Sequence, residues 1–413
     1  MPAFPEPSET FIVSKARGLL RRGFDIQIVT FRRNAHLDQL FGGLGEFTDR
    51  ITVVPSLRHG PNRALGFGRW ASVISHHRAR STGRYLAGMS RPFRSSMLSA
   101  PLFDGAVAAL SPDIVHFEFG HIAAGRCAVG LLAGCPVTVS FRGFDICLWR
   151  IHDKRAYDSV WREVHAIHTL GSDLAARVAE RGCPARVPVS LIPPAIDTDF
   201  WRREGGAPRE AGRPGRVRIL SVGRLVPKKA YPDALAAVAL LADRLRRQRG
   251  PVPEYRIAGD GPLRAELEAS VDRLGLGPIV TFLGHLDRTS LHREYCEADL
   301  LLHTASSEGF GNSVIEAQAM GVAVVCTDAE GLRENVDADV TGLVVPRGDV
   351  ERLAHALGRL VSDSGLRDAM GAAGVERART LFTMTAHLDR WENFYLDVTA
   401  AGSLGGVARS RAE

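Results

Sequence analysis

Lysine is nearly missing from this chain of 413 residues. Only four of its 52 basic residues are lysines, and the others are arginines; the lysines are Lys15, Lys154, Lys228 and Lys229. Such a bias indicates that arginine is used wherever any cation will serve. The two adjacent lysines therefore mark a place where a function is worth seeking.

Paired cysteines and long apolar runs are also missing. The six cysteines form no Cys-x-x-Cys pair and no metal-finger spacing with histidine, which favours free thiols in a reducing compartment. No apolar run approaches the roughly 20 residues that a membrane-spanning helix needs, and the start has no signal-peptide pattern. We therefore expect a soluble, cytoplasmic protein.

The composition excludes disorder and fibrous repeats as descriptions of the whole chain. Apolar residues make up 45% and charged residues 24%, close to the averages of globular proteins. A length of 413 residues exceeds one ordinary hydrophobic core and predicts two to three domains.

Acidic residues are missing from one long stretch, Ile51–Phe103, which carries eight arginines. One interpretation is a solvated helix face that balances acidic regions elsewhere. The other is a patch that holds the protein peripherally at an anionic inner membrane, or that faces a phosphorylated acceptor. Nucleic acid is not an expected partner, because the patterns that read grooves or single strands are missing.

Short apolar runs alternate with helical segments almost from end to end. The expected strands are Phe24–Thr30, Ile51–Pro55, Asp113–Phe119, Pro136–Arg142, Ala166–Leu170, Val189–Ile192, Val217–Val222, Tyr255–Ala258, Val280–Leu283, Asp299–His303, Ala323–Cys326 and Gly342–Val345. The helices between them include Ile122–Ala133 and Asn312–Met320. Repeated β-α-β units predict parallel sheets with helices on both faces. We therefore expect an α/β protein of two Rossmann-like, doubly wound lobes facing across a cleft, with ligands at the carboxyl ends of the strands.

The same pattern gives the domain boundaries. We expect a first lobe at 1–200, a polar linker rich in Gly and Pro at 201–216, a second lobe at 217–384, a last helix at 385–400 and a disordered tail at 401–413. No strand precedes the loop that opens the chain, although a doubly wound lobe normally begins with one. Either the true start lies upstream or the first lobe lacks a strand.

The strongest motif is the segment Ser307–Glu316, which follows an expected strand directly. Free backbone N–H groups at the start of a helix near Asn312, beside two glycines, form a site suited to a phosphate or pyrophosphate. Glu316 could accept two hydroxyls of a ribose, and Glu308 could reach a hydroxyl of a sugar. The alternative is that Glu316 only complements the helix dipole and that Glu308 is a surface residue.

A second motif is the loop from Gly223 to Ala230, which follows the first strand of the second lobe. Arg224 and Lys229 are five residues apart across it, so both cations could converge on one diphosphate and stabilise it as it leaves. Spacing alone does not choose between Lys228 and Lys229. An exposed basic turn is the alternative.

Three further turns carry weaker signals. Gly259 and Gly261 frame a tight Gly-Asp-Gly-Pro turn between a strand and a helix. In the first lobe His116 lies in a strand near the expected ligand edge, and it could equally be a packing residue. Arg142 and Asp145 bracket a glycine turn, where Asp145 could simply cap the next helix.

In sequence, these motifs resemble the retaining GT-B glycosyltransferases, specifically glycosyltransferase family four. Gly-Arg-Leu…Lys, Gly-Asp-Gly-Pro-Leu and Glu-(seven residues)-Glu appear in the family's order and spacing. The opening Phe4–Ile12, with Ser8 and Glu9 on the acceptor side, is similar to the subgroup of exopolysaccharide and colanic-acid-like synthesis.

The resemblance implies a set of roles. Arg224 and Lys229 would bind the donor diphosphate, Glu308 the donor sugar and Glu316 the ribose. The phosphates would lie on the backbone of the residues after Glu308, which are Gly309, Phe310, Gly311, Asn312 and Ser313. No metal or other cofactor is expected, and the last helix would return to the first lobe.

Three departures from the family pattern accompany this resemblance. The family's first strand is missing, and Ala230 stands where glycine usually follows the lysine. Arg142 stands where many members have a histidine. Arginine can donate hydrogen bonds to a phosphate or a hydroxyl, but it cannot act as a base.

The expected function is transfer of a hexose from a UDP- or GDP-linked sugar to a saccharide or lipid-linked acceptor, with retention at the anomeric carbon. The attack would come from the front face, the leaving diphosphate would assist deprotonation of the acceptor, and no protein nucleophile would be needed. The alternatives are a degenerate protein that binds a nucleotide sugar without turnover, and a nucleotide-sugar 2-epimerase.

Overall fold

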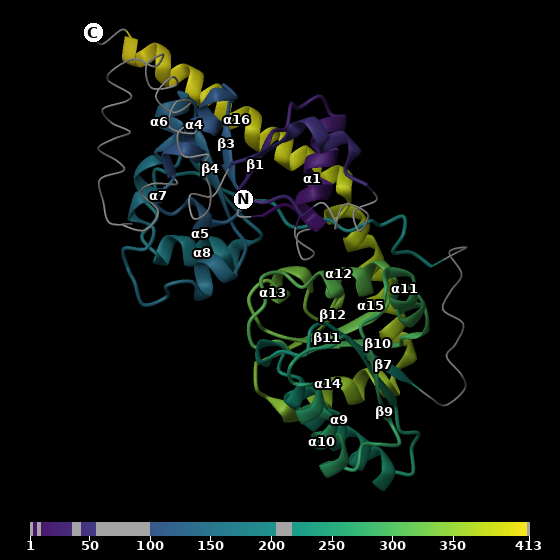
Figure 1. Ribbon diagram of the computed structural model, residues 1–413. Helices are drawn as coiled ribbons and strands as arrows, with labels where there is room; N and C mark the ends of the chain where they lie inside the picture. The colour runs from purple at the N-terminus through teal and green to yellow at the C-terminus, as the bar shows by residue number, and fades with distance from the viewer. Residues whose placement is uncertain (1–2, 6–9, 35–42, 55–99, 204–216, 411–413) are drawn as a thin grey trace. The chain divides into compact units, whose positions relative to one another are not determined.

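The chain forms two compact units in the computed structural model, which describes residues 3–5, 10–34, 43–54, 100–203 and 217–410 (Figure 1). One unit comprises Met1–Ile192 together with Leu388–Glu413, and the other comprises Pro193–His387. The second unit therefore begins earlier than the expected residue 217. Two contacts explain this. The Ile196 N–H donates to Phe382 O at 2.9 Å, and the Trp201 ring packs edge-on against the Tyr295 ring, with 5.5 Å between the ring centroids.

The first unit is built on two parallel sheets. The larger has the order β3-β4-β5-β6, and the smaller pairs β1 with β2. The strands are β1 Ile28–Thr30, β2 Ile51–Val53, β3 Val115–Phe117, β4 Val137–Phe141, β5 Ala166–Thr169 and β6 Val189–Leu191. The α-helices are α1 Thr10–Arg21, α4 Ala100–Ala109, α5 Gly120–Ala123, α6 Val129–Ala133, α7 Asp158–Glu163 and α8 Ser172–Glu180. A 3-10 turn, Gly45–Arg50, and a π turn, Phe144–Leu148, complete the described elements.

One short pairing stands near the beginning of the chain. Phe4 forms an isolated parallel bridge with Arg33, and the Phe4 N–H donates to Arg32 O at 3.0 Å. The Phe4 ring is fully buried and lies edge-on to Phe47, with 6.3 Å between the ring centroids. Within the described residues, the opening loop thus contributes one bridge position beside β1 and no strand.

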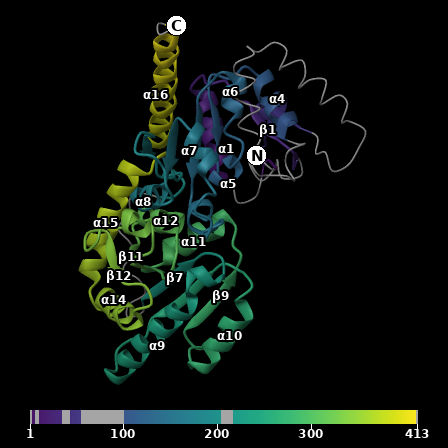
Figure 2. The same ribbon diagram turned by 90° about the vertical axis from the view of Figure 1, so that its left-hand side faces the viewer.

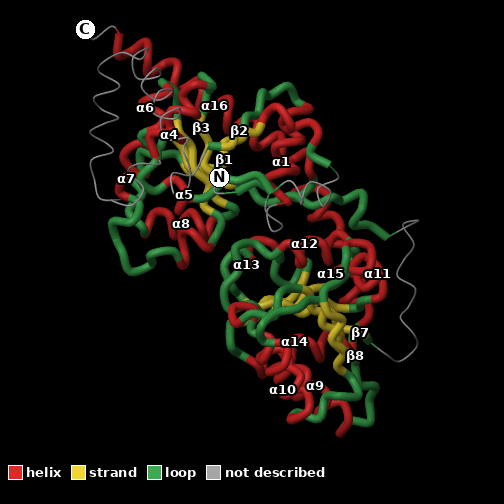
Figure 3. The backbone as a smooth tube through the Cα atoms, in the orientation of Figure 1, coloured by secondary structure: helices red, strands yellow, loops and turns green. Residues whose placement is uncertain are grey.

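The second unit is a six-stranded parallel sheet in the order β12-β11-β10-β7-β8-β9. Its strands are β7 Arg218–Val222, β8 Glu254–Ala258, β9 Val280–Gly284, β10 Leu300–His303, β11 Ala323–Thr327 and β12 Gly342–Val345. Its α-helices are α9 Tyr231–Arg247, α10 Arg264–Arg273, α11 Arg288–Glu297, α12 Asn312–Ala319, α13 Leu332–Asn335, α14 Val350–Ser362 and α15 Ser364–Leu381. Figures 2 and 3 show α11 and α12 on one face of this sheet and α9, α10 and α14 on the other. This layered arrangement buries a core of aliphatic side chains around β7, β8 and β10.

Each expected strand has a counterpart, with ends that differ by a few residues. The expected helix Ile122–Ala133 is wrong as one piece: it is split into α5 and α6, because Gly125 in the intervening turn adopts a left-handed conformation with φ +78°. The expected helix Asn312–Met320 is confirmed as α12, which ends one residue earlier.

The last helix, α16, is longer than the expected 385–400. It runs over Met384–Ser410, so residues 401–410, which were expected to be disordered, are helical. No proline interrupts this segment, and each added helical residue gains a hydrogen bond once a helix is established. The residues of α16 from Leu388 onward belong to the first unit. Of the expected linker at 201–216, residues 204–216 lie outside the described residues.

Candidate active site

The loops after β7 and β8 pack directly on each other, and glycine makes this approach possible. Gly259 has φ +142°, and a Cβ there would lie 2.0 Å from the carbonyl oxygen of Gly223. A Cβ on Gly261 would lie 2.5 Å from the carbonyl oxygen of Leu225. These predicted site glycines therefore shape the loops, and contact between them and a ligand stays a prediction.

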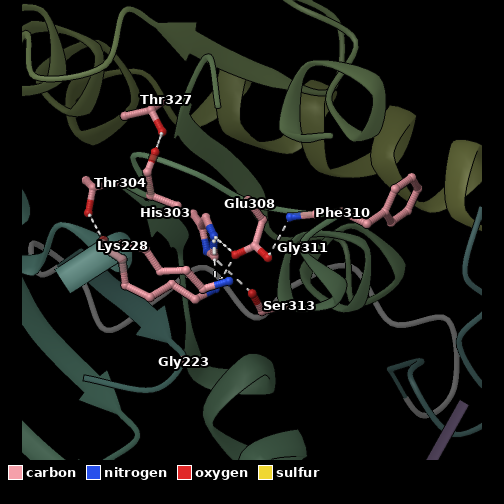
Figure 4. Close-up of polar contacts among 12 residues, drawn as sticks. Gly223, Lys228, His303, Thr304, Glu308, Phe310, Gly311, Ser313 and Thr327 are labelled. Carbon is pink, nitrogen blue, oxygen red and sulfur yellow. Dashed lines mark hydrogen bonds and ion pairs between the residues drawn. The ribbon is translucent and has the colours of Figure 1, made fainter. Parts of the chain in front are cut away.

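The turn of the basic motif is Pro227–Lys229, a 3-10 turn that leads into α9. The Lys229 Nζ donates to Glu308 Oε2 in a short ion pair, with 15% and 12% of the two side chains exposed. Two residues 79 positions apart that were predicted to share a site are thus in contact (Figure 4). The sequence left Lys228 and Lys229 as alternatives for the diphosphate; of the two, Lys229 makes this pair.

The basic turn is fixed to the end of β10 through its backbone. The Thr304 Oγ1 donates to the carbonyl oxygens of Lys229 and Ala230 at 3.1 and 3.0 Å. The Ser306 N–H donates to Lys228 O at 2.8 Å. These bonds hold Lys229 in place against the loop that carries Glu308.

His303, the last residue of β10, lies at the centre of this group. Its Nε2 is 3.4 Å from both Lys229 Nζ and Glu308 Oε2, and its Nδ1 is 3.4 Å from Ser313 Oγ on α12. The side chain is 3% exposed. No sequence motif pointed to His303 as a site residue, although its place at the carboxyl end of a strand was a signal that could have found it.

Charge sets the protonation of these groups. Burial raises the pKa of Glu308, but its hydrogen bond with His303 and the charges of Lys229 and Lys228 outweigh burial and hold that pKa well below its usual range. Burial, together with the charge of Lys229, lowers the pKa of His303. At neutral pH the site therefore contains an ionised Glu308 and a neutral His303.

Arg224 stands apart from this group. Its side chain is exposed and makes no hydrogen bond or ion pair with another described residue. The structure therefore does not bring Arg224 and Lys229 to a common protein partner. Their convergence on a diphosphate stays a prediction.

The start of α12 lies next to Glu308 in the chain. Gly311 precedes it in a left-handed conformation with φ +86°, and no described side chain caps the first turn. The Asn335 Nδ2 donates to Phe310 O, and the Phe310 ring is buried edge-on against Phe382 at 5.7 Å. Asn312, the first residue of the helix, is exposed. These contacts fix the turn and leave a helix N-terminus of the kind that binds anions.

Glu316 lies further along α12. The Tyr295 hydroxyl, from α11, donates to Glu316 Oε2 at 3.2 Å and to Ser313 O at 3.0 Å. Burial raises the pKa of Glu316 to about 7, although the hydrogen bond from Tyr295 and the charge of Arg288 act in the opposite direction. Glu316 is therefore a carboxyl group whose ionisation changes near neutral pH.

The predicted residues of the first unit are held by protein contacts. His116 Nδ1 is 2.8 Å from Thr138 Oγ1, and its Nε2 is 2.9 Å from Ser140 Oγ. The Arg142 Nη2 donates to Glu118 Oε2 at 2.8 Å, and its guanidinium lies 4.3 Å from the centroid of the Phe11 ring. The packing interpretation of His116 thus has direct support, and a contact between these residues and an acceptor stays a prediction.

Asp145 binds the backbone of its own turn. Its carboxylate accepts hydrogen bonds from the N–H groups of Gly120, Arg142, Gly143 and Ile146, at 2.8, 2.9, 3.1 and 3.2 Å. This network joins the loops after β3 and β4. Asp145 lies inside the π turn Phe144–Leu148, whose N-cap is Gly143, so it fixes these loops and is not the N-cap of the next helix. Ser8 and Glu9 lie outside the described residues, as do residues 55–99 of the arginine-rich stretch.

A buried ion pair that no sequence motif predicts lies beside Arg142. The Lys15 Nζ donates to Glu118 Oε1, lies 3.4 Å from the Tyr395 hydroxyl and stands 4.0 Å from the centroid of the Trp391 ring. Burial lowers the pKa of Lys15 to about 8, although the charge of Glu118 opposes this. Two residues of α16 thus cover the pair.

Two features of the described residues bear on other ligands. They contain no helix that is both long and apolar enough to cross a membrane. They also contain no group of three or more His, Cys, Asp or Glu side chains placed to hold a metal ion. The absence of a metal requirement stays a prediction.

Comparison with known proteins identifies both halves of the chain. Residues 8–200 match the family model described as Glycosyltransferase Family 4, and residues 208–377 match the one described as Glycosyl transferases group 1. Both halves thus match glycosyltransferase families, and the chain is a glycosyltransferase. The parallel sheets of its two Rossmann-like units are those of the GT-B fold.

Relatives of this glycosyltransferase match it over nearly its whole length. The amylovoran biosynthesis glycosyltransferase AmsK of Erwinia amylovora is 25% identical, covering 93% of this chain and 95% of its own. An Escherichia coli protein named as a candidate colanic acid biosynthesis glycosyltransferase, WcaL, is 26% identical, covering 91% and 92%. Among solved structures, Anabaena Alr3699/HepE in complex with UDP has a TM-score of 0.71 at 17% identity, covering 95% and 97%.

Proposed function

We propose that this glycosyltransferase moves a hexose from a nucleoside-diphosphate sugar to a saccharide or lipid-linked acceptor, with retention of configuration, in exopolysaccharide synthesis. The observation that carries the donor side is the Lys229–Glu308 pair beside the start of α12. The names of the amylovoran and colanic acid relatives support the pathway class. The UDP and UDP-glucose complexes of HepE support a nucleotide-sugar donor.

The site offers each part of such a donor a partner of suitable chemistry. Lys229, the exposed Arg224 and the backbone N–H groups at the start of α12 would bind the diphosphate. Glu308, which is ionised, would accept a hydrogen bond from a hydroxyl of the sugar. Glu316 would accept hydrogen bonds from the ribose. Because these cations and dipoles are fixed before the reaction, they would stabilise the charge that develops on the leaving group.

The proposed reaction breaks the bond between the anomeric carbon and the diphosphate oxygen. The acceptor oxygen forms its new bond to the anomeric carbon on the same face, and an oxygen of the leaving diphosphate takes the acceptor proton. The protein contributes position and charge and forms no covalent intermediate.

A thermal-shift panel with UDP, GDP, ADP and CMP tests the donor site, with wild type, Lys229→Ala and Glu316→Ala. A nucleotide at 100 times its Kd adds about 2.7 kcal/mol of stability, a shift of roughly 5–11 °C for a domain of this size. Lys154→Ala is the matched control, because Lys154 is an exposed lysine of the first unit.

We expect one clear responder that is retained in the Lys154→Ala variant and lost in the other two. The responding nucleotide then names the donor class, and incubation with the corresponding sugar nucleotides measures turnover. Equal shifts in all variants would contradict the donor site, and binding without turnover would show that the protein only binds the donor.

A further inference from the structure

The ion pair between Lys229 and Glu308 conflicts with the roles that the proposed function gives to each partner. Lys229 is to bind the diphosphate and Glu308 the sugar, yet in the structure each side chain neutralises the other. When a diphosphate attracts Lys229, the mostly buried Glu308 loses its closest cation. An ionised carboxylate in such a place needs another hydrogen-bond donor, because an unpaired buried charge is strongly unfavourable.

His303 is placed to be that donor. Its Nε2 is 3.4 Å from Glu308 Oε2, the same carboxylate oxygen that Lys229 contacts. The ring comes from the end of β10, whereas Glu308 lies on the following loop, so the contact does not depend on the basic turn (Figure 4). The imidazole therefore keeps its position when Lys229 moves.

The other ring nitrogen has a partner suited to this task. His303 Nδ1 is 3.4 Å from Ser313 Oγ in the first turn of α12. A neutral imidazole carries one proton, so with Nε2–H donating to Glu308 the Nδ1 accepts from the Ser313 hydroxyl. Both contacts are satisfied by a single tautomer of the neutral ring.

We propose that His303 is a positioning residue, which keeps Glu308 aimed at the donor sugar after Lys229 has turned to the diphosphate. This inference rests on the proposed function, and it adds a residue that binds neither phosphate nor ribose. Loss of His303 should therefore affect differently the affinities of two ligands that share a nucleotide. Of the two members of the ion pair, a nucleoside diphosphate needs only Lys229, whereas the corresponding nucleotide sugar needs Glu308 as well.

The test measures the affinity of UDP or GDP, whichever responds, and of its hexose derivative in wild type and His303 variants by calorimetry. For His303→Leu we expect roughly tenfold weaker binding of the nucleotide sugar, as for loss of one hydrogen bond to a charged group. Binding of the nucleoside diphosphate should change by less than about twofold. His303→Gln, whose amide can replace Nε2–H, should restore most of the sugar-dependent affinity.

Two comparisons keep the test decisive. If His303→Leu does not fold, His303→Gln is compared with His303→Asn. The shorter amide of asparagine replaces Nδ1 and should not restore the affinity for the nucleotide sugar. Equal loss of affinity for both ligands in all variants would mean a merely structural role and overturn the inference. Unchanged affinity for both would also overturn it while the proposed function stands. If wild type binds no nucleotide, the proposed function falls and the inference falls with it.

Discussion

Each unit of the molecule contains a lysine paired with a glutamate that follows a parallel strand. In the first unit Lys15 contacts Glu118, which follows β3, and in the second Lys229 contacts Glu308, which follows β10. These pairs use two of the four lysines in a chain that otherwise uses arginine. The same kind of pair therefore occurs beyond the carboxyl end of a parallel strand in each unit.

The surroundings of the two pairs differ. Lys15 is 5% exposed and covered by Trp391 and Tyr395, and Arg142 provides Glu118 with a second cation. Lys229 is 15% exposed, and its neighbour His303 is a neutral side chain. From this difference we predict that the pair beside Trp391 and Tyr395 serves stability, whereas the pair beside a helix N-terminus and glycine turns is available to a ligand.

Breaking the pair of the first unit should have the largest effect on stability. Glu118→Ala leaves Lys15 and Arg142 buried without their carboxylate, so we expect a loss of about 3–5 kcal/mol in the free energy of unfolding. Denaturant unfolding measures it. Glu46→Ala, which breaks a more exposed pair with Arg17, is the control and should cost less than about 1 kcal/mol. Equal costs would contradict the structural role of the buried pair.

Breaking the pair of the second unit should mainly affect catalysis. Glu308→Gln removes the charge and keeps the shape, and we expect kcat to fall by roughly 10²–10³-fold, as when one preorganised electrostatic contact is lost. Steady-state transfer assays measure this loss, and the melting temperature checks that the fold is retained. A fall in the melting temperature as large as that of Glu118→Ala, with kcat unchanged, would show that both pairs are structural.

The pH dependence of nucleotide binding should come from Glu316. Burial raises its pKa to about 7, and the ionised carboxylate is the better acceptor for ribose hydroxyls. Below pH 7 Glu316 is mostly protonated, so binding must release a proton and the affinity should fall by up to about tenfold for each pH unit. Above pH 7 the affinity should level off. Titration calorimetry between pH 5.5 and 8.5 checks this, and Glu316→Gln should bind weakly with a flat profile. A flat profile in wild type would contradict the assignment.

The smallest expected effect distinguishes the adjacent lysines. Lys229 pairs directly with Glu308, whereas Lys228 acts on that carboxyl group through its charge. Lys228→Ala should weaken nucleoside diphosphate binding by no more than about threefold, as expected for a partly screened charge, and Lys229→Ala by tenfold or more. Affinities measured side by side decide this. The opposite order would assign the diphosphate to Lys228.

The sequence predicted the strands of all three sheets because short buried parallel strands are continuous apolar runs. The resemblance to the family also assigned Lys229 and Glu308 to one donor site, and the structure brings them together because they follow the neighbouring parallel strands β7 and β10. The sequence did not predict the Lys15–Glu118 pair, whose members are 103 residues apart on elements without a motif. It did not select His303 either, because the role of that ring follows from three side-chain contacts and not from spacing.

The central claim is that one Lys–Glu pair binds the donor and the other maintains the fold. The most direct measurement is the melting temperature of Lys15→Ala and Lys229→Ala, each with and without the responding nucleoside diphosphate. We predict that Lys15→Ala melts well below wild type and keeps the full ligand-induced shift, whereas Lys229→Ala loses that shift. A Lys229→Ala variant that keeps the shift, or a Lys15→Ala variant that loses it while still folded, would contradict the account.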